Sequence, residues 1–222
     1  MMRTKACIFD LDGVIVDTAK YHFLAWTRLA EQIGIKFTGN DNERLKGVSR
    51  MDSLDIILEI GNVTLPDNLK LEYAKLKNDW YVEYISKMTP EEILPGCLDF
   101  VRSLKLAGIK TAIGSASKNT PMILERVGIE EYFDAVSDGN IVSKAKPNPE
   151  VFLKAAEMLG VKPSECFVFE DAQAGVQAAL NAGMMCVGIG AADVLQKAHF
   201  VVEGLTGMSL EKLELIENGI LL

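Results

Sequence analysis

Short apolar runs alternate with segments of helical periodicity over the second half of the chain, from about residue 95 onward. Each unit consists of a helix-period segment, a glycine and an apolar or β-branched run, and the glycines are Gly108, Gly128, Gly160 and Gly183. A glycine at such a joint supplies the left-handed residue that ends a helix. Near-continuous apolar runs between helices are typical of a parallel sheet covered on both faces. This half of the chain is therefore predicted to be α/β, with a Rossmann-like parallel sheet and strands at residues 109–113, 133–136, 166–169 and 184–189.

A first apolar run near the N-terminus, Ala6 to Phe9, has the same strand-like character, yet the next run appears only at residue 109. The intervening chain shows apolar residues at helical spacing, as in Leu54, Ile57 and Leu58, and contains no strong strand. The simplest explanation is a helical cap domain inserted after the first strand. We therefore expect an α/β core formed by residues 1–16 and 91–222, and a helical cap formed by residues 17–90.

The composition fits a compact folded chain and excludes two classes of partner. Of the 222 residues, 49% are hydrophobic and 24% are charged, which is ordinary for a globular protein and unlike a disordered one. The net charge of -8 gives no general attraction to nucleic acid or to an anionic membrane. Neither is expected as a partner, whereas a small anionic substrate requires local lysine and arginine side chains.

The same sequence predicts a cytoplasmic protein, which we expect to be a monomer. The first predicted strand begins almost at once, which leaves no room for a signal peptide, and no apolar stretch is long enough to span a membrane. The cysteines lack the spacing of a metal or redox motif. They are interpreted as buried thiols in a reducing compartment, and they are Cys7, Cys97, Cys166 and Cys186.

Two carboxylates, Asp10 and Asp12, follow the first predicted strand in the segment Phe9-Asp10-Leu11-Asp12-Gly13. While the chain stays extended, residues two apart point to the same side. In open parallel sheets the ligand crevice lies beyond the carboxyl ends of the strands, where this pair is expected. The pair is a candidate for catalysis, although an ordinary Asp-Gly turn after a strand gives the same pattern.

A second acidic pair, Glu170 and Asp171, follows the predicted strand at residues 166–169. Asp171 could instead cap the helix expected from about Ala174 to Ala182. If the two strand ends converge, four carboxylates share one site, and each close pair costs up to about 4 kcal/mol at an effective dielectric constant of about 20. A divalent cation relieves this repulsion, and oxygen ligands without histidine or cysteine favour Mg²⁺ over zinc.

Two further segments offer groups that bind phosphate. One precedes a predicted helix, where hydroxyl and amide groups suit an anion, and it reads Ser115-Ala116-Ser117-Lys118-Asn119. The other is Lys146-Pro147, whose lysine has no acidic neighbour in the sequence and is expected to neutralise a transferring phosphoryl group. The alternatives are that the hydroxyls only cap the helix and that the lysine is only a loop residue.

In their order and spacing, these four segments resemble the motifs of the haloacid dehalogenase superfamily over almost the entire chain. The resemblance implies a phosphotransferase in which Asp10 is the nucleophile and Asp12 the general acid/base. It also implies that Ser115 and Lys146 bind the phosphoryl group. The implied Mg²⁺ ligands are Asp10, Asp12 through its backbone carbonyl, Glu170 and Asp171.

The helical insertion carries two features that bear on the substrate. A stripe spaced by four residues, Thr18, His22 and Trp26, either faces the ligand or is only a packing face. A glycine between two cations interrupts the helical pattern in the segment Lys46-Gly47-Val48-Ser49-Arg50. Arg50 can bind phosphate in a forked geometry, although the segment could also be a solvated loop.

With Asn78, these cap features are similar to those of sugar phosphomutases of the superfamily. The similarity implies interconversion of β-glucose 1-phosphate and glucose 6-phosphate through an aspartyl-phosphate and glucose 1,6-bisphosphate. The distal part of the sugar phosphate would contact the segment 46–50 and Trp26, with Lys118 and Asn119 from the core. One departure is Ala172, where such a mutase is expected to carry serine. The alternatives are a sugar-phosphate phosphatase with the same core motifs and a binding protein that keeps the fold without catalysis.

Overall fold

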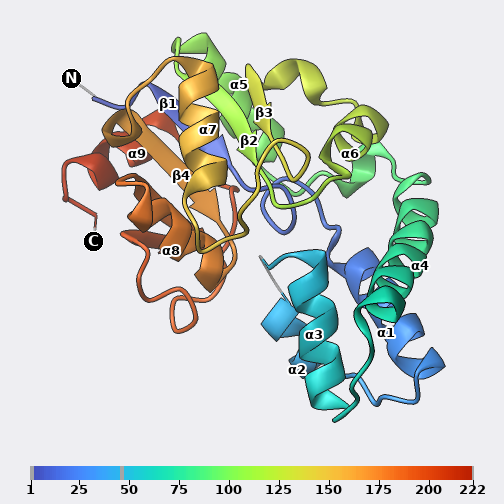
Figure 1. The fold of residues 1–222 in the computed structure, drawn as a ribbon. Helices are drawn as coiled ribbons and strands as arrows, with labels where there is room; N and C mark the ends of the chain where they lie inside the picture. The colour runs from blue at the N-terminus through green and yellow to red at the C-terminus, as the bar shows by residue number, and fades with distance from the viewer. Residues whose placement is uncertain (1–2, 46–47, 222) are drawn as a thin grey trace.

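The computed structural model describes residues 3–45 and 48–221. Within this part of the chain, six parallel strands form one sheet in the order β3-β2-β1-β4-β5-β6 (Figure 1). This is the strand order of a doubly wound Rossmann-like sheet, so the predicted α/β fold class is confirmed. The strands are β1 (Ala6–Phe9), β2 (Lys110–Gly114), β3 (Ala135–Ser137), β4 (Cys166–Glu170), β5 (Met185–Ile189) and β6 (Phe200–Val202).

Side chains of the central strands alternate between two hydrophobic clusters, one on each face of the sheet. In β1, Cys7 and Phe9 pack into one cluster, and Ala6 and Ile8 pack into the other. The first cluster includes residues of α5 (Cys97–Leu106), α6 (Thr120–Val127) and α9 (Leu210–Glu217), and the second those of α7 (Glu150–Leu159) and α8 (Gln173–Asn181). Because both faces are buried, the strands require continuous apolar runs.

Most strands lie where the apolar runs predict them, and the four joint glycines all have positive φ angles. The third strand begins at Ala135, two residues later than predicted, because residues 130–132 form a short 3-10 helix before it. Strand β6 has no counterpart among the predictions. It is three residues long and lies at the edge of the sheet, so its apolar run is too short to stand out.

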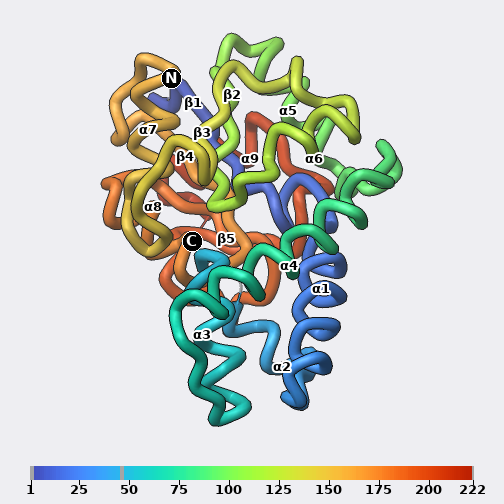
Figure 2. Tube along the Cα trace, turned by 45° about the vertical axis from the view of Figure 1, so that its right-hand side comes forward, coloured from blue at the N-terminus to red at the C-terminus, as the bar shows by residue number. Residues whose placement is uncertain are grey.

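Of the five α-helices that the described residues form between β1 and β2, the first four belong to the predicted insertion. They are α1 (Ala19–Gln32), α2 (Gly39–Asn42), α3 (Arg50–Ile60) and α4 (Asp67–Ile85). Figures 1 and 2 both place them at one end of the molecule, beyond the edge of the sheet. A separate hydrophobic cluster that includes Leu29, Leu54 and Ile57 holds them together. The domain boundaries after residue 16 and after residue 90 stay a prediction.

The two segments that connect these helices to the sheet run side by side. Val16 forms an antiparallel bridge with Ile93. The Leu94 amide donates to the Ile15 carbonyl at 2.9 Å, and the Asp17 amide donates to the Glu92 carbonyl at 3.2 Å. The helical insertion is therefore joined to the core by a pair of hydrogen-bonded linkers.

The strand register brings the predicted motifs to one edge of the sheet. Phe9 pairs with Ile113 of β2 and with Phe169 of β4, so the residues that follow these three positions emerge together. The four cysteines are buried free thiols, as expected. Among the described residues, no helix has both the length and the apolar character needed to cross a bilayer.

Candidate active site

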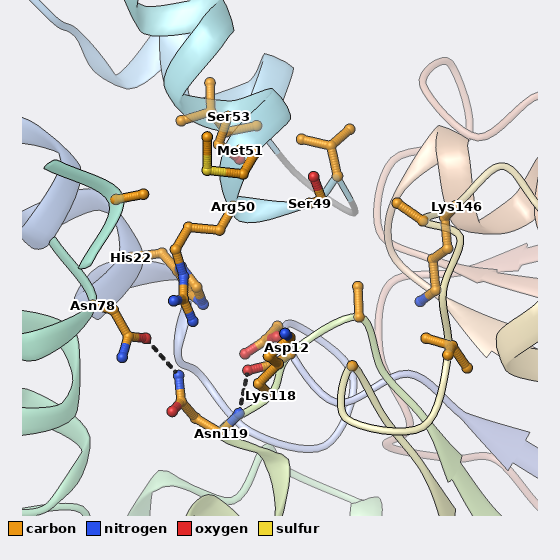
Figure 3. Close-up of a pocket in the computed structure, with 18 of the residues that line it drawn as sticks. Asp12, His22, Ser49, Arg50, Met51, Ser53, Asn78, Lys118, Asn119 and Lys146 are labelled. Carbon is orange, nitrogen blue, oxygen red and sulfur yellow. Dashed lines mark hydrogen bonds between the residues drawn. The ribbon is translucent and has the colours of Figure 1, made fainter. Parts of the chain in front are cut away.

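A cavity of about 480 Å³ lies where the carboxyl ends of the central strands meet the inserted helices (Figure 3). Most of the residues that the sequence predicts for the site line this cavity. Those that line it are Asp10, Asp12, His22, Trp26, Val48, Ser49, Arg50, Asn78, Ala116, Ser117, Lys118, Asn119, Lys146 and Asp171.

Three predicted residues lie just outside the lining of this cavity. Thr18, Ser115 and Glu170 are each fully buried, and they contact Asp12, the Ser117 amide and Lys146 respectively. Two others, Lys46 and Gly47, lie outside the described residues.

The innermost part of the site is an acidic cluster held by one lysine. Carboxylate oxygens of Asp10, Glu170 and Asp171 lie within 4.8 Å of one another. The ammonium group of Lys146 lies 2.7 Å from Asp10 Oδ1 and 2.7 Å from Glu170 Oε2. Lys146 and Glu170 are almost completely inaccessible to solvent, so this network is screened very little.

The Lys146 contacts correct the expectation drawn from its sequence neighbours. The lysine has no acidic neighbour along the chain, yet two carboxylates from the ends of β1 and β4 flank it. Burial disfavours its charged form, but these two carboxylates raise the pKa of Lys146 above the usual value of 10.5. The lysine is therefore cationic at neutral pH and already tied to the carboxylate predicted to be the nucleophile.

The acidic cluster fits a divalent cation. Burial, followed by the charge of Asp10, raises the pKa of Glu170 well above its usual value, and Lys146 opposes this only in part. A divalent ion would relieve the remaining repulsion among the three carboxylates, and their oxygen donors suit a hard cation. The Asp12 carboxylate does not belong to this cluster, and the predicted ligation through its backbone carbonyl stays a prediction.

Two glycines leave room for the acidic side chains. A Cβ atom at Gly13, where φ is 80°, would collide with the Asp171 carboxylate. A Cβ atom at Gly175 in α8 would collide with the Glu170 carboxylate in the same way. The turn after β1 and the first part of α8 are thus shaped around the two carboxylates.

Asp12 lies at the entrance to this cluster and is held by Thr18. The Thr18 hydroxyl donates a hydrogen bond to Asp12 Oδ1. Burial and then the charge of Asp10 raise the pKa of Asp12 from 3.8 to about 6, while the Thr18 bond works in the opposite direction. A carboxyl group with this pKa exchanges its proton readily near neutral pH, as a general acid/base must.

The hydroxyl segment after β2 is not a helix cap. Asn119 is the N-cap residue of α6, and the Ser115 and Ser117 hydroxyls instead accept hydrogen bonds from the amides of Ser117 and Asn119, at 3.1 and 3.2 Å. The alternative that Asp171 caps the following helix is also wrong, because Ala172 occupies that position in α8. The Ser115, Ser117 and Asp171 side chains therefore lie at the edge of the sheet without capping a helix.

From the inserted helices, Arg50 reaches toward the core loop, as Figure 3 shows. It is the first residue of α3, and Ser49 before it caps the helix by accepting a hydrogen bond from the Asp52 amide. A helix N-terminus beside an arginine attracts anions. Lys118 lies across the cavity from the same helix end, so a second cationic group is available there.

Asn78 and Asn119 link the two parts of the molecule across the cavity. Asn119 Nδ2 on the core loop donates to Asn78 Oδ1 on α4 at 3.0 Å (Figure 3). Both were predicted from the sequence as substrate contacts. In this structure they pair with each other.

Lys77 is a site residue that the sequence analysis missed. Its ammonium group lies 2.9 Å from His22 Nδ1 and faces the rings of Trp26 and Tyr81 at 4.5 and 4.7 Å. Burial, with the charge of Arg50, lowers the pKa of Lys77 to about 7, and burial lowers the pKa of His22 well below 6.5. A neutral imidazole that accepts at Nδ1 carries its proton on Nε2.

A signal for Lys77 is present in the sequence. The buried residues of α4 are Ala74, Lys77, Tyr81 and Ile85, whose spacing traces one face of a helix. A lysine in an otherwise buried face is unusual and points to a function.

Together these groups can transfer a phosphoryl group. A carboxylate nucleophile lies beside a lysine and a cluster suited to a divalent cation, and a second carboxyl group with a raised pKa is poised to move a proton. A separate cationic region lies on the other side of the same cavity.

Comparison with known proteins agrees with this chemistry. The β-phosphoglucomutase of Bacillus subtilis is 47% identical over 211 residues, which cover 94% of this chain and 93% of that protein. A phosphorylated carbohydrates phosphatase of Thermotoga maritima is 33% identical over 182 residues, 81% of this chain and 82% of that protein. The crystal structure of a β-phosphoglucomutase from Clostridium difficile matches with a TM-score of 0.93 and 42% identity, over 98% of both chains.

The model of the haloacid dehalogenase-like hydrolase family matches residues 4–183. This range contains the four core motifs on which the predicted resemblance depends, from Asp10 to Asp171. The resemblance is confirmed, and the chain belongs to the haloacid dehalogenase-like hydrolase family.

Proposed function

We propose that the protein is a β-phosphoglucomutase, which interconverts β-glucose 1-phosphate and glucose 6-phosphate and uses Mg²⁺ as its metal. The observation that carries this proposal is that one cavity has cationic groups at two places. Lys146 lies beside Asp10, and Arg50 and Lys118 lie toward the inserted helices. A mutase handles a sugar with a phosphate at each end, whereas hydrolysis of one phosphate needs only the first of these places.

The proposed reaction begins with the phosphorylated form of Asp10. The free hydroxyl of the sugar phosphate attacks the phosphorus atom, its proton passes to Asp12, the bond from phosphorus to the Asp10 oxygen breaks, and glucose 1,6-bisphosphate and the free Asp10 carboxylate form. The bisphosphate then turns over in the site, so that its other phosphate lies next to Asp10. The Asp10 carboxylate attacks that phosphorus atom, the bond to the sugar oxygen breaks, and Asp12 returns its proton to the leaving oxygen.

Asp10, Glu170 and Asp171 are the residues proposed to hold the metal, together with the backbone carbonyl of Asp12. When bound, Mg²⁺ would neutralise charge on the phosphoryl oxygens. The side chain of Lys146 is expected to share this task, because it already contacts Asp10 and is almost wholly buried. Ser115 is proposed to shape the phosphate loop through its bond to the Ser117 amide.

The inserted helices are proposed to hold the distal phosphate and to exclude water. Arg50, the N-terminal end of α3, Lys118 and Asn119 would bind that phosphate. His22, oriented by Lys77, would donate from Nε2 to a sugar or phosphate oxygen. Positioning of the sugar hydroxyl by these groups favours transfer to sugar over transfer to water.

A substitution at Arg50 tests whether the inserted helices bind the distal phosphate. Arg50→Ala removes a cation that only a ligand with a distal phosphate can use. We expect kcat/KM for glucose 6-phosphate formation to fall by about 100-fold, which corresponds to the roughly 3 kcal/mol of a charge-assisted hydrogen bond. Hydrolysis of a small ester such as p-nitrophenyl phosphate, which has no second phosphate, should change by less than about 3-fold.

The control for this experiment is Arg44→Ala. Arg44 forms an exposed ion pair with Glu59 at 3.2 Å and does not line the cavity, so both activities should be kept. An equal loss of both activities in Arg50→Ala would contradict a second phosphate site on the inserted helices.

A further inference from the structure

The start of helix α1 lacks the stabilising groups that a helix usually carries. Thr18 stands at the N-cap position, yet its side chain makes no capping hydrogen bond, and its hydroxyl donates to Asp12. The first turn of α1 also contains no acidic residue. A helix N-terminus is normally stabilised by a capping side chain or by nearby negative charge. Here the residue that could cap the helix is used at the active site.

Glu92 brings negative charge to the first turn of α1 from a distant part of the sequence, in addition to Asp17, which lies 3.7 Å from Lys20. It ends the short 3-10 turn Pro90–Glu92 on the second linker. Its Oε2 accepts a hydrogen bond from the Tyr21 hydroxyl at 2.8 Å and pairs with Lys20 Nζ at 3.0 Å. Both partners lie in the first turn of α1. The Glu92 side chain is only 14% exposed, while that of Lys20 is 44% exposed.

The backbone of Glu92 strengthens this attachment. Its carbonyl accepts the hydrogen bond from the Asp17 amide, directly before Thr18. The Thr18 carbonyl in turn accepts from the Tyr21 amide at 3.0 Å. Glu92 therefore contacts the chain on both sides of Thr18, which restricts where the Thr18 hydroxyl can lie.

We propose that Glu92 is a positioning residue for proton transfer: its carboxylate fixes the first turn of α1 on the second linker and so keeps the Thr18 hydroxyl on Asp12. Glu92 touches neither Asp12 nor the cavity and acts through Tyr21, Lys20 and Thr18. The inference rests on the proposed function in one respect, which is the role of Asp12 as general acid/base.

Kinetics of three variants test the proposal. Glu92→Ala removes both side-chain contacts. Glu92→Gln keeps an oxygen that accepts from Tyr21, and Tyr21→Phe removes only that hydrogen bond. For glucose 6-phosphate formation we expect kcat of Glu92→Ala to fall by about 10-fold or more, since a misplaced general acid loses part of its roughly 100- to 10,000-fold contribution. KM should stay within about 2-fold, because the distal phosphate site is untouched.

Two variants that remove only part of the Glu92 contacts, Tyr21→Phe and Glu92→Gln, make the test specific. Tyr21→Phe should lower kcat less than Glu92→Ala does, and adding Tyr21→Phe to Glu92→Ala should cause no further loss, because both act through one contact. Glu92→Gln should restore part of the lost kcat. The matched control is Glu83→Gln on α4, which removes an exposed ion pair with Lys87 and should leave kcat unchanged. If Glu92→Ala does not fold, Glu92→Gln and Tyr21→Phe carry the test.

Hydrogen exchange separates this proposal from the proposed function. In the protein without ligand, Glu92→Ala should speed amide exchange at residues 18–24 and not in α3. If the wild type makes no glucose 6-phosphate, the proposed function fails. The kcat values of the same variants are then compared for release of inorganic phosphate from glucose 6-phosphate. The leaving oxygen of that reaction also needs a proton. A Glu92→Ala variant with wild-type kcat, or one in which only KM rises, would overturn the proposal.

Discussion

Lys77 carries an ammonium group into a position where an apolar side chain would be expected. It is 2% exposed and contacts His22 Nδ1 and two aromatic rings, and the charge of Asp12 offsets its burial only in part. Burying an incompletely compensated charge costs stability, and part of that cost appears as the lowered pKa of Lys77. The residue is explained by what it does for His22 and not by packing.

Replacing this lysine should therefore stabilise the fold while it harms activity. Lys77→Met keeps the length of the side chain and removes the charge. We expect the free energy of unfolding at pH 6 to rise by about 1–3 kcal/mol, less than the full cost of the buried charge because His22 Nδ1 loses its donor. The same variant should lose at least about 10-fold in kcat/KM. Urea denaturation and steady-state kinetics measure the two effects.

The stability gain should also depend on pH. The pKa of Lys77 is about 7 in the folded protein and 10.5 as its usual value, so between these limits the unfolded chain binds a proton that the folded protein has released. The contribution of Lys77 to the free energy of unfolding therefore rises with pH from about 7 to about 10. The gap between Lys77→Met and wild type should shrink over this window. The exposed control Lys87→Met should show no such trend, and a constant gap would contradict a lowered pKa.

At the scale of single residues, the sequence predicted the site residues that directly follow or end a strand, such as Asp10 and Glu170. It failed where the decisive contact joins residues far apart in the chain. Lys146 lies 136 residues from Asp10, and Glu92 lies 71 residues from Tyr21. Nothing in the local sequence of Lys146 or Glu92 reveals the partner, because each contact depends on how whole elements pack.

At the scale of elements, the turn after β1 sets the position of the acidic cluster. Gly13 adopts a φ of 80° and lies against the Asp171 carboxylate, while its amide donates to the Val16 carbonyl at 2.9 Å. The turn thereby brings the first linker back beside the strand end. A side chain at this position would meet both a backbone penalty and a collision.

Gly13→Ala should separate these two effects when compared with Gly34→Ala. Gly34 has a similar φ of 75° but an added Cβ meets nothing within 4 Å. Both variants should lose about 1–2 kcal/mol of stability from the left-handed backbone. Only Gly13→Ala should displace Asp171, lower kcat by about 100-fold and raise the Mg²⁺ concentration needed for half-maximal activity. Equal activity in the two variants would contradict the contact with Asp171.

The elements themselves were largely predictable because burial on both faces imposes clear apolar runs. Helix α8 lies one residue earlier in the chain than predicted. Strand β6 was missed because only three residues of an edge strand contribute to the pattern. The lysine in the buried face of α4 was not predicted, because apolar periodicity does not mark a polar residue.

At the scale of the whole molecule, the site is shared between two parts that the paired linkers connect. The sheet edge supplies Asp10, Asp12 and Lys146, and the inserted helices supply His22 and Arg50. The sequence indicated both sets but not how far apart they lie, since that distance depends on the relative placement of the two parts. The monomeric state stays a prediction, as does the location in the cytoplasm.

The central claim is that the phosphoryl group on Asp10 passes to a sugar hydroxyl and not to water. The most direct measurement is a phosphorus NMR time course of the protein with Mg²⁺, β-glucose 1-phosphate and a trace of glucose 1,6-bisphosphate, with a chelator-treated sample as the control. The account predicts that glucose 6-phosphate accumulates at the expense of β-glucose 1-phosphate, and that neither changes in the chelated sample. Release of inorganic phosphate without glucose 6-phosphate would contradict it.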